Sequence, residues 1–132
     1  MPVLNVTRKT WLATTVRKAD RFLTRLVGLL RREALGPEEA LWLIPSKGVH
    51  TVGMKFPIDV VFLDQTNKVL AAIPGLPPYR MSPILLSARS ILELPYGTIR
   101  KSATEVGDQL EILLAESSHM DDLRETLLTR VG

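Results

Sequence analysis

The 132-residue sequence has no cysteine, few aromatic residues and no long apolar run. The absence of cysteine excludes disulfides, thiolate nucleophiles and cysteine-ligated zinc or iron–sulfur centres. Because aromatic residues make up only 5% of the chain, the core has to be built from Leu, Val and Ile. No apolar run approaches the roughly 18 residues that a membrane-spanning helix needs, so the sequence predicts no transmembrane segment.

The usual sequence signatures of nucleotide binding and nucleophilic catalysis are also missing. The chain contains no G-x-x-x-x-G-K-[ST] loop, no G-x-G-x-x-G turn and no G-x-S-x-G elbow. The first residues, MPVLNVTRKTW, lack the basic-then-apolar pattern of a secretory signal. The sequence therefore predicts a cytoplasmic protein that uses no cofactor.

The charge of the chain is unevenly distributed. Residues 1–32 carry eight Lys or Arg and one Asp, whereas residues 33–132 carry nine Lys or Arg and thirteen Asp or Glu, which together give the net charge of +3. The early basic residues Lys18, Arg21, Arg25 and Arg32 are typical of a solvated helix face, with binding to an anionic polymer or membrane as the alternative. Nucleic acid is disfavoured, because single-strand binders interleave aromatic residues with their basic ones.

Short β-rich runs separated by turn residues predict six or seven strands. The run from 58 to 63 is apolar except at Asp59, which predicts a strand buried on both faces. Asn67 suits a left-handed position in the turn that follows, and the proline-rich segment 74–83 predicts a stiff surface loop. The predicted strands cover residues 3–6, 11–16, 41–44, 58–63, 68–73, 85–94 and 109–115.

Helical periodicity is confined to two segments, about 18–32 and 118–131, with a turn or short helix at 98–103. The resulting fold class is mainly β with helices (α+β). We expect a compact antiparallel β-barrel or jelly-roll-like sandwich, with one amphipathic helix packed across it and an extra C-terminal helix. Residues 1–116 would form the single domain and residues 117–132 the helical extension.

The candidate site is the segment from Gly48 to Asp59, where polar residues interrupt an apolar stretch. A buried carboxylate at Asp59 needs a cation, several N–H donors or a proton. A His–Asp pair of this kind is more often a satisfied structural contact than a functional site. Among functions, a ligand-binding module with a polar site around His50 and Asp59 is favoured. The candidate ligand-binding residues are His50, Thr51, Met54, Lys55, Asp59, Arg89 and Glu93.

Other functions remain open alternatives. A hydrolase or lyase would use His50 as a general base oriented by Asp59, but the residues favour binding over catalysis. A metal held by His50, Asp59 and Glu93 is disfavoured, because no close-spaced ligand pair exists. The partner would be a small molecule or peptide. The sequence predicts a monomer, although the apolar stripe within 118–131 offers a dimer or protein-interaction surface.

Four spaced segments carry a resemblance to a known family. They are GVHTVGMKFPIDVVFLD at 48–64, SARSILELPYG at 87–97, GDQL at 107–110 and RLVGLL at 25–30. Taken in their order along the chain, these segments resemble the family called domain of unknown function 192, over about residues 3–115. The chain departs from the family pattern at Tyr96, Asn67 and Leu30.

The resemblance implies a compact β-barrel or jelly-roll-like domain with a helix packed across it, and no established activity. Many family members look exported or membrane-anchored, which this sequence does not. The family's polar positions correspond here to His50, Thr51, Met54, Asp59, Glu93 and Asp108.

Overall fold

The strands form two sheets. The computed structural model describes residues 2–19, 36–51 and 54–113, and the account below concerns these residues. The smaller sheet has the order β2-β1-β8 and is antiparallel. Its strands are β1 (Val3–Asn5), β2 (Thr10–Ala13) and β8 (Leu110–Ile112).

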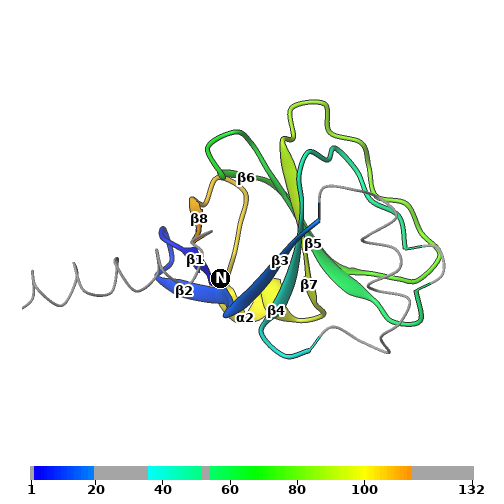
Figure 1. Ribbon diagram of the computed structural model, residues 1–132, viewed down its shortest axis with the longest axis horizontal. Coiled ribbons are helices and arrows are strands. Elements are labelled where there is room, and N and C mark those ends of the chain that lie inside the picture. Colours follow the sequence, from blue (N-terminus) through cyan, green and yellow to red (C-terminus); the bar gives the residue numbers. More distant parts are fainter. Residues whose placement is uncertain (1, 20–35, 52–53, 114–132) are drawn as a thin grey trace, which may run out of the picture.

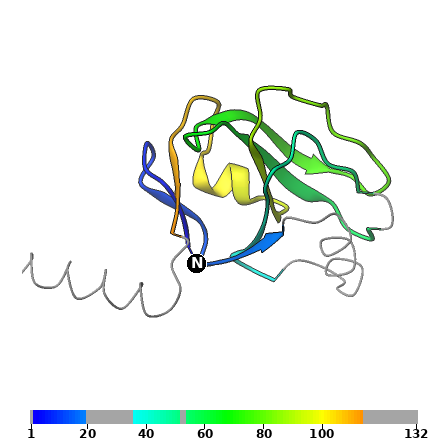
Figure 2. The ribbon, with the colours of Figure 1, turned by 45° about the horizontal axis from the view of Figure 1, so that its top comes forward.

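The larger sheet has five strands in the order β3-β4-β7-β5-β6. A short helix, α2 (Thr98–Ser102), follows β7 and lies between the two sheets (Figure 1, Figure 2). None of the helices in the described part of the chain is long and apolar enough to cross a membrane. The five strands are β3 (Thr15–Ala19), β4 (Glu39–Leu43), β5 (Ile58–Leu63), β6 (Val69–Leu76) and β7 (Ser90–Pro95).

The mainly β class is confirmed, but the barrel is not. The sheets meet where the chain passes from β2 to β3 at Thr14, and at an isolated bridge between Lys68 and Gln109. Hydrogen-bonded strands nevertheless form two separate sheets rather than one closed barrel. The arrangement is closer to a sandwich with α2 between its layers. The predicted helix at 118–131 and the domain boundary near 116 lie outside the described residues.

The secondary structure predicted for the chain after Val16 was wrong. Lys18 belongs to β3, so the helix predicted from about residue 18 does not start there, and residues 20–35 of that prediction lie outside the described residues. β3 also pairs with β4 in parallel, whereas an all-antiparallel fold was expected. The connection between these strands is long enough for the crossover that a parallel pair requires.

The buried strand at 58–63 and the left-handed turn residue were predicted correctly, but several strand boundaries were wrong, and the strand predicted at 11–16 is divided between β2 and β3. All six residues of β5 are buried, and Asn67 has a φ of 66°, as predicted. β6 continues through Pro74 to Leu76, inside the segment expected to be a loop. Proline is tolerated there because β6 is an edge strand. In contrast, β7 begins at Ser90 and not near residue 85.

The five-stranded sheet is buried on both faces. One face packs toward the small sheet and α2, and the other packs under the loops that follow β4 and β6. This double burial explains the nearly unbroken apolar run of β5. The first face carries Val16, Trp42, Val61, Leu92 and Leu94, and the second carries Leu41, Val60, Phe62 and Ile91.

Candidate functional site

Asp59 is completely buried in β5 and is held by backbone donors. One carboxylate oxygen accepts a hydrogen bond from the N–H of Gly75 at 2.9 Å. The other accepts from the N–H of Ile99, in the first turn of α2, at 2.8 Å. A carboxylate in this place satisfies helix N–H groups that have no partner within the helix. The sequence left open whether a cation, N–H donors or a proton would compensate the buried Asp59 carboxylate, and the fold supplies N–H donors.

His50 does not pair with Asp59. It lies in the loop after β4, is half-buried, and forms an isolated bridge with Met81. Both carboxylate oxygens of Asp59 are engaged by Gly75 and Ile99 instead. The expected contact between His50 and Asp59, on which a general base would depend, is therefore not formed. Lys55 and Arg89 are exposed and do not pair with Asp59 either.

Thr51 and Met54 are buried and serve the fold. The Thr51 hydroxyl donates to the carbonyl of Pro77 and accepts from the N–H of Arg80 at 2.8 Å. The Thr51 N–H donates to the Arg80 carbonyl at 2.8 Å, and Tyr79 donates to the Thr51 carbonyl at 3.0 Å. Thr51 thus fixes the loop before β5 to the loop after β6, while Met54 packs in the adjoining core.

Glu93 is completely buried in β7, but on the other face of the sheet from Asp59. The register pairs Asp59 with Leu94 and Val60 with Glu93. Because successive residues of a strand point to opposite faces, the two carboxylates project to opposite sides. Within residues 2–19, 36–51 and 54–113, no three His, Asp or Glu side chains are grouped to hold a metal ion.

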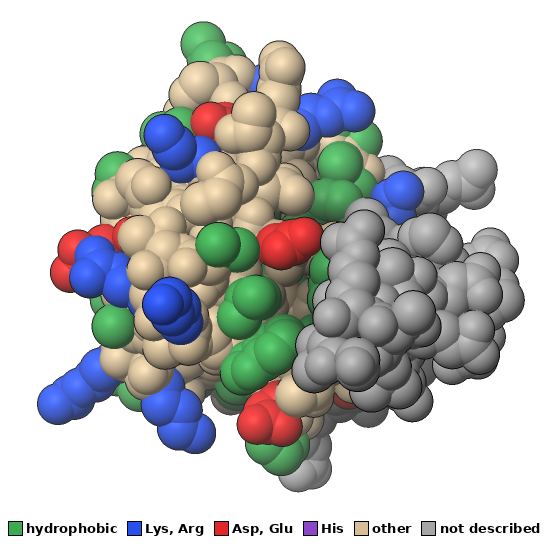
Figure 3. All heavy atoms as spheres, turned by 90° about the vertical axis from the view of Figure 1, so that its left-hand side faces the viewer, with side chains coloured by type: hydrophobic (Ala, Val, Ile, Leu, Met, Phe, Trp, Pro, Cys, Tyr) green, Lys and Arg blue, Asp and Glu red, His purple; other side chains and the backbone are tan. Residues whose placement is uncertain are grey.

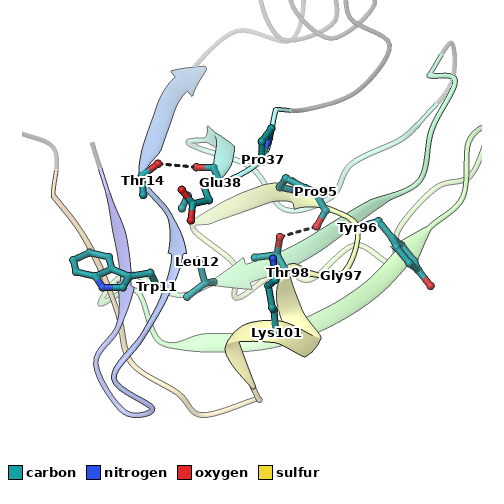
Figure 4. Close-up of a pocket in the computed structure, with 11 residues that line it drawn as sticks. Trp11, Leu12, Thr14, Pro37, Glu38, Pro95, Tyr96, Gly97, Thr98 and Lys101 are labelled. Atoms are coloured by element: carbon teal, nitrogen blue, oxygen red, sulfur yellow. Dashed lines mark hydrogen bonds between the residues drawn. The ribbon is translucent and has the colours of Figure 1, made fainter.

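A hollow of about 310 Å³ lies beside α2, at the mouth between the two sheets. Figure 4 shows Trp11 and Tyr96 at its two ends, with Glu38, Thr98 and Lys101 between them. The Trp11 and Tyr96 residues are 58% and 68% exposed. The wall is completed by Leu12, Ala13, Thr14, Pro37, Pro95 and Gly97.

Two opposite charges line this hollow without neutralising each other. In the part of the chain that the structure describes, neither the Glu38 carboxylate nor the Lys101 ammonium forms an ion pair. Glu38 also has a φ of 61°, a left-handed conformation that is uncommon for this residue type. Its carbonyl accepts hydrogen bonds from the N–H groups of Thr14 and Thr15, which hold it at the bend between β2 and β3.

Asp59 does not line this hollow but holds α2, which forms part of its wall. Its carboxylate joins Gly75 to the start of α2, and α2 supplies Thr98 and Lys101 to the wall. The Tyr96 ring lies directly over Gly75, because a Cβ built at Gly75 would come within 2.3 Å of a ring carbon. Asp59 is therefore a positioning residue for the wall of the hollow.

Sequence reasoning missed the residues that line the hollow. They come from β2 and the residue after it, from the two residues before β4, and from the segment that runs from the end of β7 into α2. Tyr96 was noted only as a departure from the family pattern. Arg89 lies elsewhere, in a second hollow of about 420 Å³ that Trp42, Ile44, Gln65 and Asn67 also line.

The contact between Gly75 and Tyr96 leads to a testable prediction. Gly75→Ala should destabilise the fold by about 2 kcal/mol or more, because the φ of 64° disfavours alanine and the new methyl group collides with the ring. Gly107→Ala is the matched control, since its φ is 92° but nothing lies within 4 Å of the added Cβ. Urea unfolding of both variants measures the difference, and equal losses would contradict the contact.

A separate polar cluster ties the small sheet to the segment after α2. Asp108 is buried and accepts hydrogen bonds from Asn5 at 3.0 Å, Arg8 at 3.1 Å and the Glu105 N–H at 3.0 Å. Asn5 also donates to the hydroxyl of Thr104 at 3.1 Å. Burial opposes ionisation of Asp108, but the hydrogen bonds and the charge of Arg8 outweigh it and hold its pKa below the ordinary value.

The fold and the hollow define a small, mainly β protein with two open sheets and a concave surface between them. The family model DUF192, described as "Uncharacterized ACR", matches residues 3–112. The chain belongs to this family, which confirms the resemblance seen in the sequence. The two features described above, the Asp59 support and the Asp108 cluster, both involve polar positions of the family pattern.

Relatives agree with this assignment. A UPF0127 protein of Pyrococcus furiosus is 36% identical over 115 residues, covering 83% of this chain and 96% of the relative. A UPF0127 protein of Pyrococcus abyssi is 31% identical over 102 residues, covering 73% of this chain and 84% of the relative. A crystal structure of a protein of unknown function from Novosphingobium aromaticivorans has a TM-score of 0.72 at 21% identity, covering 85% of this chain and 84% of that one. This last likeness concerns the fold alone.

Proposed function

We propose that the protein is a binding module whose ligand occupies the hollow between Trp11 and Tyr96. The ligand is a small molecule that carries both an acidic and a basic group, such as an amino acid, a short peptide or an acidic amino sugar. The basic group would pair with the Glu38 carboxylate and the acidic group with the Lys101 ammonium. The exposed rings of Trp11 and Tyr96 would cover apolar parts of the ligand at either end.

The observation that carries this proposal is the pair of uncompensated opposite charges in one hollow. Surface charges are usually solvated singly, whereas Glu38 and Lys101 face a common space of about 310 Å³. That volume lies at the lower end of the range of roughly 300–1,000 Å³ for ligand pockets. Charge-assisted hydrogen bonds in a partly enclosed site are stronger than neutral ones and fix the orientation of a ligand.

The proposed function is still the binding module that the sequence favours, but its ligand site is the hollow beside α2 and not the surroundings of His50. Asp59 takes part as a support behind α2, while His50, Thr51 and Met54 belong to the loops beyond the other face of the sheet. Direct ligand contacts by His50, Thr51, Met54, Lys55, Arg89 or Glu93 stay a prediction. Within the described residues, His50 and Asp59 do not form the pair on which the alternative hydrolase or lyase would depend. The cytoplasmic location and the monomeric state likewise stay predictions.

The two tryptophans provide a direct test. Trp11 lines the hollow and is exposed, whereas Trp42 is buried with 5% of its surface accessible. We expect a panel of amino acids, dipeptides and acidic amino sugars to contain a member that shifts the Trp11 indole N–H resonance and leaves that of Trp42 in place. If every compound that binds shifts the Trp42 resonance alone, the hollow is not the site.

Charge-neutralising variants test the chemistry of the same compound. Glu38→Gln combined with Lys101→Gln should weaken its binding about tenfold or more, because two charge-assisted contacts are lost. The matched control is Lys68→Gln combined with Glu111→Gln, which neutralises one exposed charge of each sign away from the hollow. Isothermal titration measures both affinities. Unchanged binding by the first variant would refute the proposed charge pairing.

A further inference from the structure

Two loops run side by side at the end of the molecule opposite the small sheet (Figure 1, Figure 2). One follows β4 and the other connects β6 to β7, and we refer to their described residues, 45–51, 54–57 and 77–89, as the basic lobe. Ser82 donates to the carbonyl of Val49 at 2.9 Å, and Leu85 to that of Lys47 at 2.9 Å. These bonds, with those of Thr51, make the two loops one unit.

Large apolar side chains project from this lobe into solvent. Four of the eight exposed large hydrophobic residues in the described part of the chain belong to it. They fall within eight consecutive positions of the connection from β6 to β7. Their concentration in one loop marks a candidate interaction surface, because exposed apolar residues that gather in one region often mark sites of interaction. The four are Tyr79 at 63%, Met81 at 73%, Ile84 at 67% and Leu86 at 80% exposure.

The lobe is also positively charged throughout. Residues 45–57 and 77–89 contain Lys47, Lys55, Arg80 and Arg89 but no Asp or Glu. The remainder of the chain has thirteen Lys or Arg against fourteen Asp or Glu, so the excess of positive charge resides in these two segments. In the structure as described, none of the four makes an ion pair, and Lys47 donates to the carbonyls of Leu86 and Ala88.

The end of the molecule that carries the small sheet differs in its charges. Figure 3 shows that face, where acidic side chains stand among the hydrophobic and basic ones. Exposed apolar tips accompanied by cations and no anions therefore distinguish the basic lobe from the face in Figure 3.

We propose that the basic lobe docks on the surface of an anionic lipid membrane. The side chains of Met81, Ile84 and Leu86 enter the boundary between headgroups and acyl chains, and the exposed Lys55 and Arg80 side chains lie at the level of the lipid phosphates. Burial of apolar side chains combined with attraction to anionic lipid is the general basis of such peripheral binding. Several backbone groups of the loops, among them the N–H groups of Ser82, Leu85 and Ala88, are hydrogen-bonded within the lobe and can approach the interface without losing those partners.

A lipid surface fits these residues better than nucleic acid or a protein groove. Nucleic acid would leave the apolar tips of Ile84 and Leu86 without contacts. A protein partner would have to match apolar tips that are spaced along an irregular loop, with Pro83 between Met81 and Ile84, whereas fluid lipid adapts to them. The lobe lies apart from the hollow at Trp11 and Tyr96, so this inference does not depend on the proposed ligand.

The test is sedimentation of the full chain with vesicles of two compositions. Vesicles of equal parts phosphatidylcholine and phosphatidylglycerol should carry the protein down at low salt, and high salt should weaken binding. Pure phosphatidylcholine vesicles should bind it at least about tenfold more weakly, since each basic side chain near an anionic surface contributes about fivefold. Failure to bind the anionic vesicles at low salt would overturn the proposal and leave a protein partner as the explanation of the exposed surface.

Paired variants assign the binding to this lobe. Ile84→Ser combined with Leu86→Ser should lower partitioning to anionic vesicles about tenfold or more, whereas Val6→Ser combined with Val106→Ser, which changes exposed apolar residues elsewhere, should not. Lys55→Gln combined with Arg80→Gln should have a similar effect, and Lys68→Gln combined with Arg100→Gln should lower it much less. Circular dichroism confirms that each variant is folded. If the lobe variants and their controls bind equally, another surface of the chain is responsible and the assignment is wrong.

Discussion

Asp59→Ala should lower the free energy of unfolding by about 3 kcal/mol or more, the largest effect that we expect of a single substitution in this protein. The carboxylate is completely buried, and its two hydrogen bonds are the ones that Gly75 and Ile99 donate. Truncation would leave two backbone N–H groups without their acceptor and a cavity beside α2. An unsatisfied buried donor costs about 1–3 kcal/mol, and the cavity adds to this.

Chemical denaturation measures this loss, and a second aspartate provides the control. Asp64 also accepts backbone hydrogen bonds, from Thr66 at 2.8 Å and Lys68 at 2.9 Å, but in an exposed turn where water can replace it. Asp64→Ala should therefore cost about 1 kcal/mol. Ligand binding in the hollow should fall in the Asp59→Ala variant even where it remains folded, because α2 loses its anchor. Equal destabilisation by the two substitutions would contradict the structural role of Asp59.

Asp108→Asn should lower the free energy of unfolding by about 2 kcal/mol at neutral pH. It should also weaken the dependence of that free energy on pH in the acid range. The pKa of Asp108 is lower in the folded state than in the unfolded chain. The stabilisation that it supplies is therefore complete above the unfolded pKa, near 4, and is lost as the pH falls through the folded value. The asparagine variant has no proton to take up, so its stability should depend less on pH in this window.

Urea midpoints measured between neutral pH and about pH 3 would show this difference in slope. Glu105→Gln is the control, because Glu105 pairs with Arg8 in an exposed ion pair whose Glu side chain is 69% accessible. Exposed pairs contribute little, so this variant should remain close to the wild type. An Asp108→Asn variant whose stability depends on pH in the acid range as the wild type's does would show that Asp108 does not carry the pH dependence.

Local features of the fold could be predicted from the sequence because their causes are local. The apolar run at 58–63 and the left-handed residue at Asn67 have signatures within a few positions. The extension of β6 through Pro74 could not be predicted, since it depends on β6 lying at the edge of its sheet. The parallel pairing of β3 with β4 likewise depends on how distant segments meet.

The candidate site was predicted only in part, for the same reason. A buried aspartate that requires hydrogen-bond donors was correctly identified at Asp59, but its donors are backbone groups of Gly75 and Ile99, which carry no residue-type signal. The hollow is lined by residues from three separate stretches, so no spacing in the sequence connects Glu38 with Lys101. Only the register of the strands and the position of α2 bring them together.

The pairing of β1 with β8 has a consequence for synthesis of the protein in the cell. Val3 lies opposite Ile112, so β1, the central strand of the small sheet, cannot form all its hydrogen bonds until β8 has been synthesised. A nascent chain on the ribosome can assemble parts of the larger sheet, but β1 cannot obtain both neighbours until translation has passed residue 112. Contacts so distant in sequence slow folding, and the unfinished chain exposes strand edges meanwhile. We therefore expect the small sheet to form only after residue 112 has been synthesised and has left the ribosome.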